Sequence, residues 1–224
     1  DASVGLTENT AVGYQALRGS TTAADNTGSR NTAFGSQSLM DNTSGFENTA
    51  IGASALYSNT TGRINTAFGS KALYSNVDGG YNLAIGRGAL YSNVSNEANT
   101  AIGYDAMYYA DSSATGSTTY NTALGFSALR GSTTASNNTG DFNTALGSQT
   151  LNNSTSGSRN TAGGYRSLYD NTSGYSNVAY GYYSLDSNVG KGGSTAIGYE
   201  AMRYADSTAT GGLTYNTALG YQAL

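Results

Sequence analysis

The sequence predicts an all-β protein, a repetitive parallel β-solenoid or β-roll of twelve coils, each of 17 or 22 residues. The first reason is that the stretch N-T-A-I-G-A-S-A-L at residues 48–56 occurs twelve times as the pattern N-T-A-φ-G-x-x-A-L, where φ is apolar, either exactly or with a few substitutions. Recurrence at a fixed period is the signature of a stacked repeat architecture. The second is composition: charged residues make up only 11% of the chain, against roughly a quarter in ordinary domains. The third is that apolar residues recur in fixed columns, which favours an ordered structure over a disordered one.

The spacing of the copies defines the organisation of the chain. Successive copies are 17 or 22 residues apart, and the block 9–120 pairs with the block 121–215, with a third block starting at 216–224. We therefore predict a lead-in at 1–8 and one repeat domain at 9–224, modular along one axis. Because the pattern runs to the last residue, we expect a segment of a longer protein. The copies begin at Asn9, Asn31, Asn48, Asn65, Asn82, Asn99, Asn121, Asn143, Asn160, Asn177, Ser194 and Asn216.

Within each repeat, the sequence predicts two short strands joined by turns. Thr, Ala and a bulky apolar residue precede a fixed glycine and form the first strand. The Ala-Leu-Tyr stretch that follows is predicted as the second strand. Stretches such as 41–45 and 58–62 are rich in Asn, Ser, Thr and Gly, which favour turns. The fixed glycine marks a corner where a Cβ atom would clash with a neighbouring coil.

Two neighbouring apolar columns bear on oligomeric state. The third motif position is Ala in all twelve copies, and the fourth is bulky and apolar in eleven, with Gly163 as the exception. Adjacent strand residues point to opposite faces, so two apolar columns require two interiors. One face would line the inside of each coil, where Ala keeps the walls close, and the other would meet partner chains; the residue pattern leaves open whether the Ala or the bulky column faces the shared axis. The same argument applies to the later Ala-Leu pair. A homotrimeric fibre, with its chains intertwined or side by side, is the simplest closed arrangement. The core residues expected from this argument are Ala50, Ile51, Gly52, Leu56, Ala67, Phe68, Gly69 and Leu73.

The residues needed for common chemistry are missing. The chain has no Cys and no His, which removes disulfides, thiolate metal sites and conventional catalytic triads. Carboxylates are scattered; the equivalent Asp105 and Glu200 are 95 positions apart. We therefore expect no catalytic, cofactor-binding or metal-binding residues and no enzymatic activity. A net charge of −4 offers no basic surface for nucleic acid, and no apolar run approaches the roughly 18 residues of a membrane span.

The motif resembles known fibre repeats. N-T-A-I-G-x-x-A-L units joined by S-N-T-T-G turns resemble the repeats of bacteriophage tail-fibre proteins over residues 9–224. They are also similar to the N-S-V-A-I-G repeats in the head domains of trimeric autotransporter adhesins, which form trimeric left-handed parallel β-rolls. The units here, of 17 and 22 residues, are longer than those of the adhesin heads. The resemblance implies a homotrimeric shaft or receptor-proximal segment of a virion tail fibre, used in host-cell attachment with other fibre or virion proteins as partners. The alternative is an adhesin on the bacterial cell surface.

Two further features leave functional alternatives open. Tyr57, Tyr74 and Tyr91 follow the leucine in three successive coils and could contact a glycan or protein receptor, although stacking of their rings on one another is favoured. Asp111 and Asp206 lie in five-residue enlargements, which map to outward loops that bind a ligand or act as spacers. A column of threonines raises a third hypothesis, an ice-binding solenoid.

Overall fold

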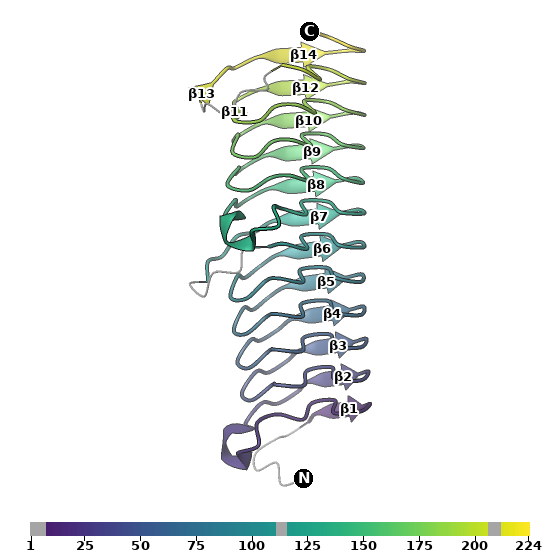
Figure 1. Cartoon of the computed structure of the whole chain (residues 1–224), viewed down its shortest axis with the longest axis vertical. Coiled ribbons are helices and arrows are strands. Elements are labelled where there is room, and N and C mark those ends of the chain that lie inside the picture. Colours follow the sequence, from purple (N-terminus) through teal and green to yellow (C-terminus); the bar gives the residue numbers. More distant parts are fainter. Residues whose placement is uncertain (1–7, 111–115, 206–211) are drawn as a thin grey trace.

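The computed structural model describes residues 8–110, 116–205 and 212–224 and shows a straight rod of stacked coils (Figure 1). One three-residue strand from each coil joins a single parallel sheet of twelve strands, in chain order from one end to the other. The predicted repetitive parallel β-solenoid is therefore confirmed. The strands are β1 (Thr10–Val12), β2 (Thr32–Phe34), β3 (Thr49–Ile51), β4 (Thr66–Phe68), β5 (Leu83–Ile85), β6 (Thr100–Ile102), β7 (Thr122–Leu124), β8 (Thr144–Leu146), β9 (Thr161–Gly163), β10 (Val178–Tyr180), β12 (Thr195–Ile197) and β14 (Thr217–Leu219).

The sheet keeps the same register across the shorter and the longer repeats. Thr10 pairs with Thr32 across a longer repeat, just as Thr32 pairs with Thr49 across a shorter one. Two of the enlarged repeats hold short 3₁₀ helices, η1 (Ala23–Asp25) and η2 (Ala135–Asn137), and β11 (Lys191–Gly192) pairs with β13 (Gly212–Leu213) in a separate two-stranded sheet. Figure 1 shows all of these projecting away from the column of long-sheet strands. The extra residues are thus accommodated without disturbing the sheet.

The predicted second strand is wrong: the Ala-Leu-Tyr stretch is a turn in the described coils. Ser54 and Leu56 have positive φ angles of 56° and 50°, and such angles bend the chain where a strand would extend it. Backbone hydrogen bonds still link the coils here, since the Leu56 amide donates to the Ala72 carbonyl at 3.0 Å. A positive φ costs a leucine about 1–2 kcal/mol, and complete burial of its side chain offsets this by about 1.5–3 kcal/mol.

This turn also corrects the argument about the Ala-Leu pair. Ala55 and Leu56 are both fully buried and belong to one interior cluster, so the two residues do not face separate interiors. The alternation of faces holds only for extended backbone, and Leu56 is not extended. The alanine column of the sheet and the Ala-Leu column of the turn together form one interior along the described coils.

Buried asparagines fill another part of the interior. The Asn48 side chain is fully buried; its Oδ1 accepts from the backbone amide of Asn65 at 3.0 Å and its Nδ2 donates to the Gly62 carbonyl at 2.8 Å. Asn59, in a second column, donates to Asn42 Oδ1 at 2.8 Å. A buried amide needs partners for both of its ends, and the neighbouring coils supply them. Asn59, the first residue of an N-x-S/T triplet, is therefore a structural residue and not an accessible glycosylation acceptor.

The fixed glycines lie where successive coils touch, as predicted. Gly52 has a φ of 133°, and a Cβ atom built on it would lie 2.6 Å from the carbonyl carbon of Gly69 in the next coil. The close approach allows the backbone ladder to continue through the corner. It makes glycine necessary at this column on steric grounds.

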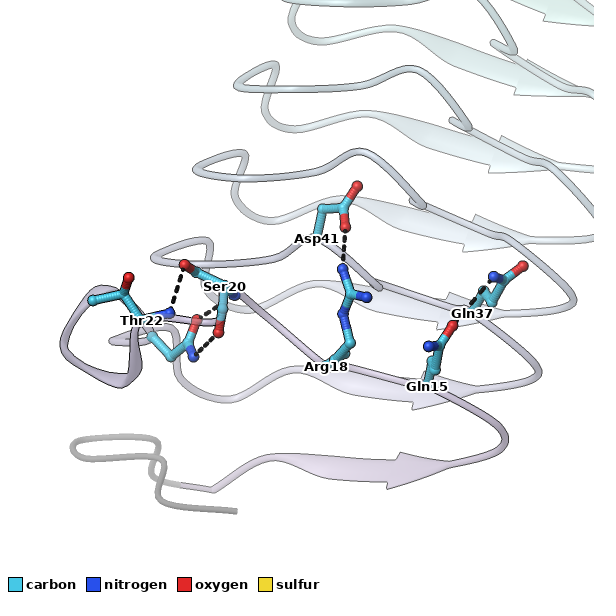
Figure 2. A network of polar contacts seen from close by, with 7 residues as sticks. Gln15, Arg18, Ser20, Thr22, Gln37 and Asp41 are labelled. Carbon is cyan, nitrogen blue, oxygen red and sulfur yellow. Dashed lines mark hydrogen bonds and ion pairs between the residues drawn. The ribbon is translucent and has the colours of Figure 1, made fainter.

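Polar side chains on the surface also link successive coils. Gln37 donates to Gln15 at 3.4 Å, and Arg18 pairs with Asp41 at 3.3 Å; Figure 2 shows both contacts. Exposed ion pairs contribute about 0–1 kcal/mol each. The buried columns, and not these surface contacts, hold the coils together.

Candidate interaction surface

The outward face of the long sheet is the most extensive candidate site. In each strand the central Ala points inward, so its two neighbours point outward and form two files. We call the file that precedes the central Ala the threonine file, and the file that follows it the outer apolar file. The outer apolar file comprises Val12, Phe34, Ile51, Phe68, Ile85, Ile102, Leu124, Leu146, Gly163, Tyr180, Ile197 and Leu219.

The predicted core residues therefore divide between two locations. Ala50, Leu56, Ala67 and Leu73 are fully buried in the interior, and Gly52 and Gly69 lie at coil contacts. Ile51 is half-buried and Phe68 is 54% exposed, so both lie outside the interior of the single chain. Their place in a core shared between chains stays a prediction. Their outward position follows from strand alternation, which places them opposite Ala50 and Ala67.

The outward face is uncharged, and the one position of the outer apolar file without a side chain is covered. Neither outward position carries a charged residue in any of the twelve strands. Gly163 lacks a side chain, but the ring of Tyr180 in the next coil lies over it: a Cβ atom on Gly163 would be 2.5 Å from Tyr180 Cδ1. The large residue fills the gap left by the small one. In the sequence, Gly163 is visible only as the one exception in the outer apolar file. Its structural role became clear from the contact with Tyr180 in the next coil.

The tyrosines that follow the leucine form a continuous stack. Ring centroids of Tyr57 and Tyr74 are 5.0 Å apart, those of Tyr74 and Tyr91 are 5.1 Å apart, and Tyr108 extends the row at 4.7 Å. Each ring covers the face of the next, which agrees with the interpretation favoured from the sequence. Only ring edges and hydroxyl groups remain for an external ligand along the row, so the row offers no platform on which sugar rings could stack.

A second stack lies beside the outer apolar file near the C-terminal end. Tyr165, Tyr182, Tyr199 and Tyr221 follow the fixed glycines, with centroid separations of 5.3, 5.3 and 5.1 Å. Tyr221 is 72% exposed, and the other three are also exposed. Each is two residues beyond a member of the outer apolar file, so exposed aromatic rings follow that file in four successive coils.

A cluster of charges and tyrosine rings links three coils near the C-terminal end. Asp186 is almost fully buried, and its Oδ1 lies 3.3 Å from Arg166 Nε. The guanidinium of Arg166 lies over Tyr169 at 3.9 Å, and that of Arg203 lies over Tyr183 at 4.2 Å. Burial raises the pKa of the Asp186 carboxyl, while Arg166 acts in the opposite direction. Sequence reasoning missed this cluster, because its members come from different coils.

The raised pKa of Asp186 predicts a pH dependence of stability. A carboxyl whose pKa is higher in the folded than in the unfolded chain binds its proton more tightly when folded. The free energy of unfolding therefore falls as pH rises from the usual pKa of Asp through the raised one. Asp186→Asn removes this loss, so the stability of the variant relative to the wild type should increase from about pH 3 to about pH 7. Urea unfolding across this range measures it; a constant difference would contradict the assignment.

The remaining sequence candidates add no site. Asp111 and Asp206 lie outside the described residues. Within residues 8–110, 116–205 and 212–224, no group of three or more potential ligand side chains could hold a metal ion. The same ranges contain no helix long and apolar enough to cross a membrane. Comparison with protein-family models, curated proteins and solved structures finds no match to this chain.

Proposed function

We propose that this chain is a structural shaft segment of a fibre of the phage tail-fibre type, in which three copies associate through the outward face of the long sheet. The shaft holds a receptor-binding part away from the virion during attachment to a host cell. The observation that carries the proposal is an uncharged file of exposed apolar side chains, running along a rod that already has an interior of its own.

The size of the exposed apolar file supports association. Eight of its members are between 36% and 77% exposed. With full areas of about 150–250 Å² for the larger side chains, they present on the order of 700 Å². This is close to the roughly 800 Å² that each partner buries in a standard interface. Exposed apolar surface of this extent marks an interaction site more often than a solvated face.

The axial period favours another copy of the same chain as the partner. The outward face repeats once per coil and keeps its register across both spacings. A partner that matches it along the rod must have the same rise per coil, which an identical parallel chain provides. Three chains around one axis bury the outer apolar file of every chain in one closed arrangement.

The alternatives differ in what they require of this face. A trimeric adhesin would use the same contact and differ in what it binds, matrix or glycan. An ice-binding face would use regular, flat files of similar residues. Here the outer apolar file mixes Val, Phe, Ile, Leu and Tyr. This unevenness supports a protein contact over an ice surface.

Light scattering on the purified chain tests the proposal. The expected mass is three times the 22.9 kDa of one chain. Phe68→Lys places an ammonium group in the contact and should weaken association by about 30-fold or more, the effect of losing an interface hot spot. Ser44→Lys, at an exposed turn position, is the control and should leave the mass unchanged. A monomeric wild type at micromolar concentration would refute the proposed contact.

A further inference from the structure

The interior contains a second asparagine ladder that is interrupted. Asn59, Asn76 and Asn93 each donate from Nδ2 to Oδ1 of the asparagine one coil earlier, at 2.8, 2.8 and 2.9 Å. The ladder resumes between Asn188 and Asn171 at 3.1 Å. Between these two runs, the chain passes through two longer repeats, 99–120 and 121–142, and then through the shorter repeat 143–159.

The interruption leaves polar atoms without partners among the described residues. Ala110 follows Asn93 in the ladder column and offers no amide, and Asn93 Oδ1 is buried without a hydrogen bond to any described group. On the far side, Ser154 occupies the column position before Asn171. Its side chain is 4% exposed, and within the same part of the chain its Oγ also lacks a partner. Such groups are rare in folded proteins and are usually satisfied by ordered water.

A small cavity lies at the interruption. Its volume is about 30 Å³, and its lining includes Ala110, Gly131, Asn138 and Ser154. Asn138 fills part of the gap: its Nδ2 donates to the carbonyls of Ser132 and Tyr109. Ser154 belongs to this lining, and its hydroxyl is the buried group without a partner among the described residues. A water molecule needs about 10–15 Å³ of such volume and two to four polar partners.

We propose that this cavity is an internal binding site for one or two ordered water molecules, with the Ser154 hydroxyl as one hydrogen-bond partner. The water takes the place of asparagine side chains that these three repeats lack in the ladder column. The three repeats without a ladder asparagine are therefore tolerated, because water supplies hydrogen bonds where the asparagines are missing.

A high-resolution crystal structure of the whole chain, together with oxygen-17 relaxation measurements of long-lived water in solution, tests the proposal. The wild type should show water density within about 2.5–3.0 Å of Ser154 Oγ. Ser154→Asn should displace that water and lower the count of long-lived waters by about one, since its amide restores the ladder. The control Ser156→Asn, at an exposed position of the same turn, should leave the count unchanged.

Two results would overturn the proposal. One is a dry cavity, without water density and able to bind xenon under pressure. The other is a Ser154 hydroxyl that donates to a protein carbonyl with no water nearby. Both are read from the wild-type chain, so they remain decisive if Ser154→Asn fails to fold.

Discussion

Replacing Gly52 by alanine should lower the free energy of unfolding by roughly 2–6 kcal/mol, from backbone strain and overpacking together. The new Cβ atom would lie 2.6 Å from the carbonyl carbon and 2.7 Å from the carbonyl oxygen of Gly69. Backbone atoms cannot move aside as a flexible side chain can, so the two coils must separate. In a linear repeat array each coil contacts only its neighbours, and this separation interrupts the stack locally. Denaturant unfolding followed by far-ultraviolet circular dichroism measures the loss.

Gly220→Ala is the matched control for this prediction. Gly220 also has a positive φ, at 126°, but a Cβ atom on it meets no atom of the described residues within 4 Å. The control therefore carries the strain of the φ angle, roughly 1–3 kcal/mol, without the collision. Equal losses for the two variants would show that coil contact does not explain the glycine column.

Ala50→Asp should destabilise the chain by about 4 kcal/mol or more, because it places an unpaired carboxylate in the apolar interior. Ala50 is fully buried, and its neighbours in the column are the alanines of the adjacent strands. Ile51→Asp, one residue further on, should reduce the stability of a single chain by only about 1–2 kcal/mol, since its side chain points outward and is half-buried. It should instead weaken association of the chains.

Unfolding curves and light scattering on the same samples separate the two effects. The expected pattern is an unfolded or aggregated Ala50→Asp variant and a folded, dissociated Ile51→Asp variant. Ala53→Asp, at an exposed position of the same coil, serves as the control and should change neither property. If Ile51→Asp remains associated, the outer apolar file is not the contact between copies. If Ala50→Asp is tolerated, the alanine column does not line the interior.

Part of the candidate surface could be predicted from residue order. The alternation of Ala50 and Ile51 indicated two opposite faces, because one three-residue strand is enough for alternation to hold. The stacking of Tyr57, Tyr74 and Tyr91 was the favoured interpretation, since residues one period apart lie in adjacent coils of a solenoid. The assignment of Ala55 and Leu56 to opposite faces was wrong. It depended on an extended backbone, and a positive φ at Leu56 is not apparent in an Ala-Leu-Tyr pattern that otherwise favours a strand.

The repeat period and the residue types were enough to predict the number of coils, the position of each long-sheet strand, the steric role of the fixed glycines and the two opposite faces of the sheet. All of these properties follow from the order of residues along the chain. Three others became apparent only from contacts in space: Leu56 shares an interior with Ala50, Tyr180 covers Gly163, and the asparagine ladder is interrupted between Asn93 and Asn171. The first depends on the sign of a backbone angle. The other two depend on which side chains contact each other between coils, and the order of residues in the sequence does not specify those contacts.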